Sequence, residues 1–285
     1  MNRDTLYVSD LDGTLLDPSS SVSAESARIL NSLIKEGAMF TVATARTPAT
    51  VQPLLEKVLP AKTPAGRDIP AIVMTGAAYW NRRLARYDYV RMMSAYDSET
   101  IAREFEAAGI HPFNYCLGQH EILNVYHTAG LTSREDAFYQ ERRHLALKRF
   151  HLGQKPKDYE ATVLFFAIGN PEKMERLCQA IRKKTECSAA WYRDIFNPEV
   201  ALMDVYAPGC SKATAIKDVA TELGASRIVV FGDNLNDLPM MEVADLSVAV
   251  ENALPGVKEL ADIVIGPNSM PSVAEFIRAD FHSEG

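Results

Sequence analysis

The chain of 285 residues lacks several features that point to particular classes of protein. It has no apolar run long enough to span a membrane and no signal-peptide pattern, so we expect a soluble cytoplasmic protein without a membrane partner. Basic residues are not in excess, because 30 Lys and Arg stand against 37 Asp and Glu and leave a net charge of −7. This balance argues against a nucleic-acid-binding surface. No sequence pattern indicates the oligomeric state.

Cysteine is also scarce, and its four positions show no paired spacing of the kind found in disulfide frameworks or zinc sites. We therefore expect all four to be reduced, small core residues. An apolar content of 47% and a charged content of 24% are close to the globular average. The chain is therefore long and apolar enough to form one large domain or two ordinary domains, each with a buried core.

Two acidic segments stand out, Asp10–Thr14 (DLDGT) and Gly232–Asp237 (GDNLND). Each follows an apolar, β-branched run that predicts a buried strand, Thr5–Val8 in the first case and Ile228–Phe231 in the second. Carboxylates gathered at strand ends repel one another and are costly to bury. A divalent cation removes that cost, and Mg²⁺ favours a few carboxylates together with water and a substrate phosphate. Either segment alone is also typical of an acidic turn, but the pair in this order favours metal-assisted chemistry on a phosphate.

Strands and helices alternate in both terminal parts of the chain, and the strands are continuously apolar. This rhythm predicts an α/β, Rossmann-like parallel-sheet core that is covered on both faces. A helix is expected to begin near Ser23 and to end at Gly37. The other expected strands are 39–43, 71–74, 246–250 and 262–265, and the other expected helices begin near 48, 212 and 271.

The middle of the chain has a different residue pattern. Its strand-forming segments mix apolar and polar residues, as in a sheet with one solvated face. Strands are expected at 121–127 and 201–206, and helices at 97–108, 133–148 and 171–184. We therefore predict that an α+β cap domain, 82–205, is inserted into a core domain formed by 1–81 and 206–285.

Four candidate residues are expected to meet at one edge of the core sheet, because ligands of open parallel sheets bind beyond the carboxyl ends of the strands. Asp10, Thr44 and Asp233 lie at such ends, and Lys212 opens a helix that points the same way. Thr44 is suited either to cap the next turn or to hold phosphate oxygens. Lys212 is either a surface lysine or a partner for an anion at the helix start.

The two aspartates of the first segment have different expected tasks. Asp10 can attack phosphorus and form an aspartyl-phosphate, which splits the reaction into two steps. Asp12 can act as general acid on the leaving oxygen and then as base for water. Asp233 and Asp237 fit helix caps or metal ligands equally well by themselves, but beside Asp10 a ligand role for Asp233 is favoured.

In motif order, the chain resembles haloacid dehalogenase superfamily phosphatases of the Cof-like group with a class IIB cap. The motifs are Asp10–Thr14, Thr44–Arg46, Ser211-Lys212 and Gly232–Asp237, and the cap insertion falls between the second and the third. The resemblance implies Asp10 as nucleophile and Asp12 as acid/base. It also implies Mg²⁺ bound by Asp10, the Asp12 carbonyl, Asp233 and Asp237, and phosphate bound by Thr44, Ala45, Lys212 and Asn236.

The leading hypothesis is therefore a magnesium-dependent phosphatase that acts on a small-molecule phosphate ester, with sugar phosphates expected. A phosphomutase of the phosphomannomutase type is the nearest alternative, since such enzymes share this cap type. A non-catalytic phospho-acceptor or metal-binding module is less favoured, because receiver domains are far shorter and lack an acid/base placed like Asp12.

Overall fold

The structure, a computed structural model, describes residues 2–157, 159, 161–194 and 197–283. These residues form two compact units, one made of the chain up to Tyr89 and from Ser211 on, the other running from Val90 to Cys210. The predicted α/β class, with a parallel core sheet and an inserted α+β unit, is confirmed. The division lies a few residues beyond the predicted boundaries at 81 and 206.

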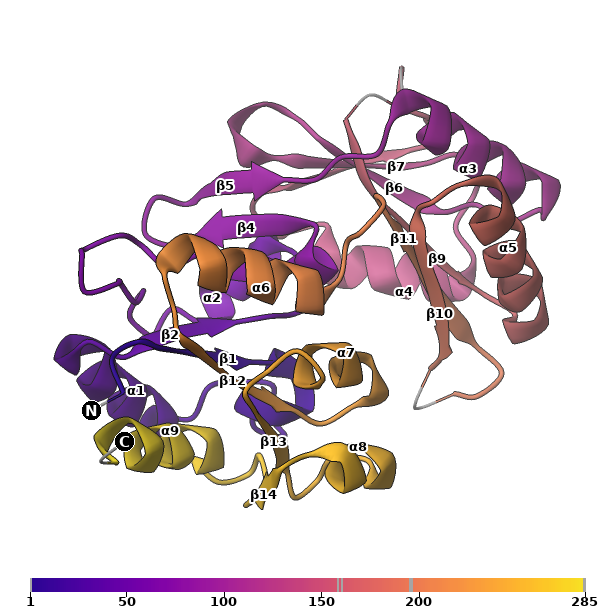
Figure 1. The fold of residues 1–285 in the computed structure, drawn as a ribbon. Helices are drawn as coiled ribbons and strands as arrows, with labels where there is room; N and C mark the ends of the chain where they lie inside the picture. Colours follow the sequence, from indigo (N-terminus) through magenta and orange to yellow (C-terminus); the bar gives the residue numbers. More distant parts are fainter. Residues whose placement is uncertain (1, 158, 160, 195–196, 284–285) are drawn as a thin grey trace. The chain divides into compact units, whose positions relative to one another are not determined.

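The first unit contains a parallel five-stranded sheet (Figure 1). Its interior strand β1 is buried along its whole length and pairs with β12 on one side and β2 on the other, which explains its continuous apolar sequence. The strands, in their order across the sheet, are β14 (Ile263–Ile265), β13 (Leu246–Val250), β12 (Arg227–Gly232), β1 (Thr5–Ser9) and β2 (Met39–Val42).

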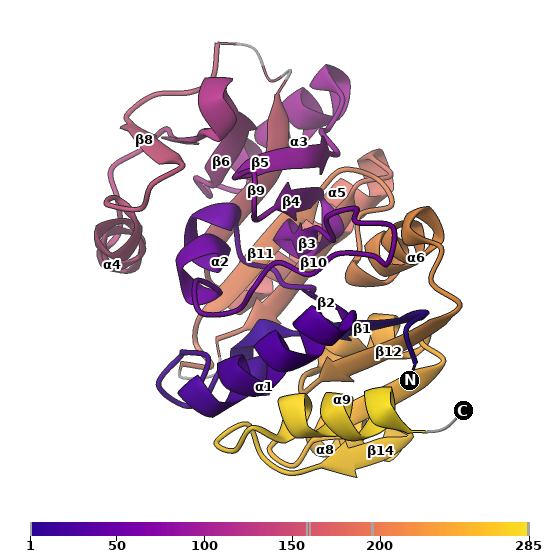
Figure 2. The ribbon, with the colours of Figure 1, turned by 90° about the vertical axis from the view of Figure 1, so that its left-hand side faces the viewer.

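Helices cover both faces of this sheet, with α1 and α9 side by side on one face and α6 on the other (Figures 1 and 2). The predicted ends of α1 are confirmed: the Ser23 hydroxyl accepts a hydrogen bond from the Ser26 N–H, and Gly37 ends the helix in the left-handed region. The helices of this unit are α1 (Ala24–Glu36), α2 (Pro48–Leu54), α6 (Lys212–Leu223), α7 (Leu238–Met241), α8 (Pro255–Leu260) and α9 (Ser272–His282).

A small three-stranded sheet extends the first unit beyond β2. It is formed by β3 (Ala71–Val73), β4 (Ala78–Asn81) and β5 (Arg86–Val90), and a parallel bridge from Ala43 to Ile72 joins it to the end of β2. Because β5 belongs to this sheet, the first unit continues past the boundary that the sequence predicted at 81.

The second unit is a six-stranded sheet in which only β7 and β8 pair in parallel. In order across the sheet the strands are β10 (Ser188–Arg193), β11 (Ala201–Tyr206), β9 (Thr162–Gly169), β6 (Phe113–Leu117), β7 (Leu123–His127) and β8 (Lys148–Leu152). The helices of this unit are α3 (Ala95–Ala107), α4 (Ser133–Arg142) and α5 (Pro171–Lys184).

The helix predicted over 133–148 is wrong in its second part. Helix α4 ends at Arg142, the chain turns at Leu147 with φ of 63°, and Lys148 then begins strand β8. Pairing with β7 therefore overrides the local helix preference, since tertiary contacts outweigh propensity in short segments.

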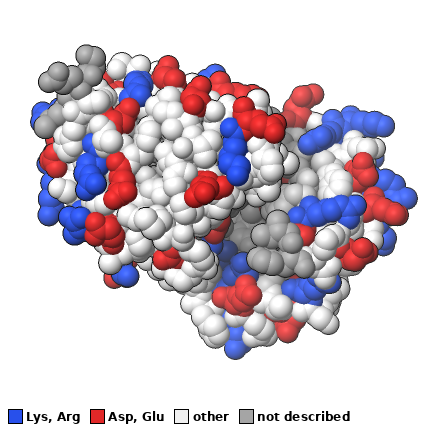
Figure 3. Space-filling model, turned by 90° about the horizontal axis from the view of Figure 1, so that it is seen from below, with Lys and Arg blue, Asp and Glu red and all other residues white. Residues whose placement is uncertain are grey.

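The surface and the cysteines agree with the composition. All four cysteines are buried, as predicted for small core residues. Acidic and basic side chains are interspersed on the face drawn in Figure 3. Among the residues described, no helix combines the length and the apolar character needed to cross a membrane.

Candidate active site

The candidate residues follow three neighbouring strands of the parallel sheet. Asp10 comes directly after β1, Thr44 lies just beyond β2, and Asp233 follows β12. The Asp10 N–H donates to the carbonyl of Phe231 in β12, so the first acidic turn begins while the two strands are still paired. Strand pairing therefore brings together segments that lie near opposite ends of the chain.

Lys212 is the centre of the site. Its Nζ donates to Asp10 Oδ1 at 2.6 Å and to Asp237 Oδ1 at 2.8 Å, and all three side chains are buried. Burial alone would lower the pKa of Lys212, but the charges and hydrogen bonds of Asp10 and Asp237 outweigh it and raise that pKa. The lysine is positioned by the start of α6, where the Ser211 side chain caps the helix by accepting the Thr214 N–H.

Three carboxylates meet at this lysine: one oxygen each of Asp10, Asp233 and Asp237 lies within 4.8 Å of the others. Burial raises the pKa of Asp10 to about 7, with the charges of Asp237 and Asp233 adding to the effect and Lys212 opposing it. Burial likewise raises the pKa of Asp233 to about 6. The single positive charge of Lys212 therefore does not balance the three carboxylates. A set of oxygen ligands with surplus negative charge fits a hard divalent cation such as Mg²⁺.

The turn after β1 and the turn after β12 contact each other at Gly13. The Thr14 hydroxyl donates to Asp233 Oδ1 at 2.8 Å, and Gly13 has φ of 77° in the left-handed region. A Cβ on Gly13 would lie 2.4 Å from Asp233 Oδ2, a contact that no packed structure tolerates. Only glycine satisfies both the turn and this approach.

Asp237 is held from both sides. Its Oδ2 accepts the N–H groups of Asp233 and Asn234, while its Oδ1 accepts from Lys212. Both readings of this residue from the sequence therefore describe part of its contacts, because it caps the turn at Leu235–Asp237 and also belongs to the carboxylate cluster.

Asp12 differs from its neighbour Asp10, because its side chain is exposed and is not part of the carboxylate cluster. Arg46 instead holds it by two bonds, from Nε to Oδ2 at 2.7 Å and from a terminal nitrogen to Oδ1 at 2.5 Å. Such a two-pronged contact fixes the orientation of a carboxylate.

The residues predicted to bind phosphate occupy different environments. Thr44 is buried and its hydroxyl accepts the Arg46 N–H at 3.1 Å, which is the turn-capping contact that the sequence allowed. Ala45 and Asn236 are exposed, in the turns that follow β2 and β12.

Two contributors, Arg46 and Asn252, lie in the motif segments of the sequence but were given no role by sequence reasoning. Arg46 and Asp12 belong to different turns, and no spacing in the sequence predicts that they pair. Asn252 donates from Nδ2 to the Gly13 carbonyl at 2.7 Å, and its Oδ1 accepts the Asn268 N–H. The position of Asn252, two residues beyond β13, was the available signal, since it is another carboxyl end of the same sheet.

Comparisons with known proteins agree with this geometry. The profile of the haloacid dehalogenase-like hydrolase family matches residues 7–277. The chain is 26% identical to the pyridoxal phosphate phosphatase YbhA of Escherichia coli, covering 94% of this chain and 95% of that protein. It is 24% identical to the 5-amino-6-(5-phospho-D-ribitylamino)uracil phosphatase YcsE of Bacillus subtilis, covering 96% and 94%.

Solved structures show a shared fold. A protein from Thermotoga maritima superposes with a TM-score of 0.74 at 21% identity, covering 98% of each chain. A subclass IIB sugar phosphatase superposes with a TM-score of 0.71 at 19% identity, covering 97% of this chain and 99% of that one.

The approach of Gly13 to Asp233 leads to a first prediction. Gly13→Ala forces a left-handed alanine against a carboxylate oxygen, so we expect a loss of about 1–3 kcal/mol in the free energy of unfolding, measured in urea. Gly256→Ala is the matched control, because Gly256 lies in α8 with open space around its Cβ position. Equal stability of the two variants would contradict the steric argument.

Proposed function

The chain belongs to the haloacid dehalogenase-like hydrolases and is a phosphatase, and we propose that it hydrolyses small phosphate esters, sugar phosphates among them, through an aspartyl-phosphate on Asp10. The observation that carries this proposal is the buried arrangement of Asp10, Lys212 and Asp237, with Asp233 beside it. A carboxylate held by a lysine at the carboxyl edge of a parallel sheet is placed to act as a nucleophile.

The substrate class is drawn from the family and from the relatives. Phosphatases of this subclass act on small phosphorylated metabolites, and the two curated relatives are named for pyridoxal phosphate and for a phosphoribitylaminouracil. We therefore include heteroaromatic phosphate esters beside sugar phosphates among the substrates to be tested.

In the first step, Asp10 attacks phosphorus. Lys212 binds Oδ1 of Asp10, so the proposed nucleophile is Oδ2. A bond forms between that oxygen and phosphorus while the ester bond to the leaving oxygen breaks, and Asp12 donates a proton to the leaving oxygen. In the second step, Asp12 takes a proton from water, whose oxygen displaces Asp10 and releases inorganic phosphate.

Asp10, Asp233 and Asp237 would hold Mg²⁺, which when bound offsets the negative charge of the phosphate and of the carboxylates. Asp237 supports the site, since both of its oxygens already accept hydrogen bonds. The Asp12 carbonyl completes the proposed ligand set.

The transferred phosphate would be bound by Lys212, the Thr44 hydroxyl, the Ala45 amide and the Asn236 side chain. We assign the choice of substrate to the unit from Val90 to Cys210, which acts as the cap in this proposal. The catalytic groups named above all belong to the other unit.

A panel of phosphate esters tests the proposal. With Mg²⁺ present, we expect free phosphate from at least one sugar phosphate or heteroaromatic phosphate, without formation of an isomeric ester. Asp10→Asn should lower kcat by about 10⁴ or more, because a neutral amide does not attack phosphorus. Asp4→Asn is the matched control, since Asp4 is exposed. An Asp10→Asn variant with a tenth of the normal rate would exclude the covalent mechanism.

The role of Asp12 is tested with two leaving groups. Asp12→Asn should lower kcat for an alkyl phosphate by about 10²–10⁴, since the alkoxide that leaves needs a proton. The loss should be smaller for p-nitrophenyl phosphate, whose phenolate leaves readily without one. Equal losses on both esters would show that Asp12 does not protonate the leaving group.

Removal of metal is the third test of this site. A chelator should abolish turnover and Mg²⁺ should restore it, whereas the larger Ca²⁺ should restore it poorly. Mg²⁺ should also raise the melting temperature, because it binds the folded carboxylate cluster. Asp233→Asn should weaken that rise, while Asp4→Asn should leave it unchanged. Full turnover in excess chelator would contradict the proposed metal site.

A further inference from the structure

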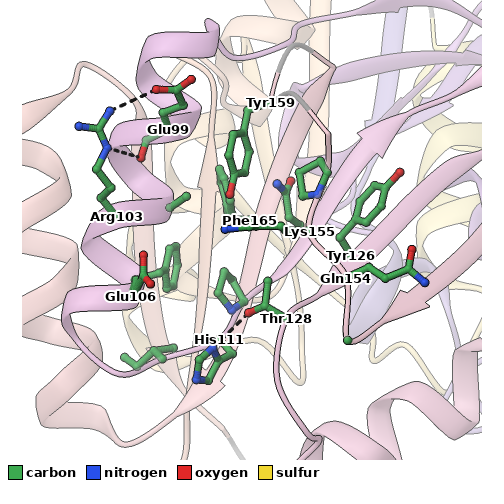
Figure 4. A pocket seen from close by; sticks show the side chains of 17 residues that line it. Glu99, Arg103, Glu106, His111, Tyr126, Thr128, Gln154, Lys155, Tyr159 and Phe165 are labelled. Atoms are coloured by element: carbon green, nitrogen blue, oxygen red, sulfur yellow. Dashed lines mark hydrogen bonds and ion pairs between the residues drawn. The ribbon is translucent and has the colours of Figure 1, made fainter.

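A cavity lies within the unit from Val90 to Cys210, and none of its lining residues is one of the catalytic groups named above. Its volume is about 630 Å³, within the range of small-molecule sites. It is bounded by α3, by strands β6, β7 and β9, and by the segment that joins β8 to β9 (Figure 4).

The floor of this cavity is a row of three side chains on neighbouring strands. Asn114 of β6 is the register partner of Tyr126 in β7 and of Phe165 in β9, so the three side chains point to the same face of the sheet. The amide of Asn114 is therefore flanked by an aromatic ring on either side, and all three residues line the cavity.

Asn114 carries an unused hydrogen-bond donor. The residue is 4% exposed, and its Nδ2 has no hydrogen-bond partner among the described residues, while its Oδ1 accepts only a weak contact from the Cys116 thiol at 3.6 Å. A buried donor without an acceptor destabilises the free protein, and such groups are rare. A ligand that brings an acceptor into the cavity would satisfy it.

The walls of the cavity carry aromatic side chains. The Tyr159 ring lies 6.4 Å from that of Phe165, and Tyr126 stacks on His151 with ring centroids 4.7 Å apart. Figure 4 shows Tyr159 and Phe165 toward α3, with Tyr126 on the opposite side. Flat aromatic walls beside the Asn114 amide favour a planar ligand.

The charges of the described lining residues cancel. Glu99 and Arg103 pair with each other at 3.2 Å on α3, and the other charged residues of the described lining are one acid, Glu106, and one lysine, Lys155. These described residues therefore carry no net charge that would attract a phosphate ester or another anion.

We propose that this cavity binds a neutral, planar heteroaromatic ring whose carbonyl or ring nitrogen accepts a hydrogen bond from Asn114 Nδ2. Nucleobases and pyridine carboxamides have this chemistry. The ring would lie against Tyr126 and Tyr159, with its acceptor edge on the amide. This site is independent of the proposed function, because no catalytic group takes part in it.

Calorimetric titration of the full chain with uracil and with nicotinamide tests the proposal. We expect saturable binding of at least one of the two rings, and about tenfold weaker binding of phenol, which offers neither a carbonyl nor a ring nitrogen. Asp10→Asn should bind as the unaltered chain does. Loss of binding in Asp10→Asn would place the ring in the catalytic site and overturn the proposal.

Substitutions in the cavity give the second arm. Asn114→Leu keeps the branched shape of the side chain and removes the donor, so we expect at least tenfold weaker binding of the ring together with an unchanged or higher melting temperature. Tyr159→Leu should also weaken binding, whereas Tyr96→Leu should not, because Tyr96 is an exposed residue of α3 outside the cavity. The proposal would be overturned if neither uracil nor nicotinamide bound, or if Asn114→Leu bound the ring as tightly as the unaltered chain.

Discussion

The catalytic unit depends on a balance of buried charge between Lys212 and the carboxylates around it. Lys212 is only 3% exposed, and its buried charge is stabilised because Asp10 and Asp237 accept hydrogen bonds from its Nζ at 2.6 and 2.8 Å. The same contacts keep the two aspartates close to each other despite their repulsion. Helix α6, strand β1 and the turn after β12 are therefore tied at one point, and Asp233 adds the negative charge that leaves room for a divalent cation.

Asp10 and Asp12 lie in environments that suit the two different tasks we propose for them. Both residues precede the left-handed turn at Gly13, yet their carboxylates face different surroundings. Asp10 is buried against Lys212, whereas Asp12 is exposed and held by Arg46. Pairs of titratable groups in contrasting environments are how active sites assign acid, base and nucleophile roles. In the proposed mechanism Asp12 gives its proton to the leaving oxygen in the first step and, as a carboxylate, takes a proton from water in the second, whereas Asp10 only forms and releases the bond to phosphorus.

Much of the core was predictable from sequence because its signals are local. Apolar strands followed by Asp10, Thr44 and Asp233 predicted a parallel sheet with a site at its carboxyl edge, and Ser23 and Gly37 predicted the ends of α1. The inserted unit was harder to predict, since its strands carry mixed sequences. The helix predicted to Lys148 overlaps the first residue of strand β8, and no local pattern predicts the rest of that strand, because its pairing with β7 is a long-range contact.

The cavity around Asn114 lay beyond sequence analysis for the same reason. Asn114, Tyr126 and Phe165 are ordinary residues within strands, and they become neighbours only through the register of β6 with β7 and β9. A shift of one residue in either pairing would turn the amide away from one of the rings. In this unit the strand register holds the Asn114 amide without a hydrogen-bond acceptor for its Nδ2 among the described residues. In the other unit the carboxylates are held together with more negative charge than Lys212 balances. In the catalytic unit surplus carboxylate favours a cation, and in the inserted unit a surplus N–H donor favours an acceptor, so the two units call for ligands of opposite chemistry.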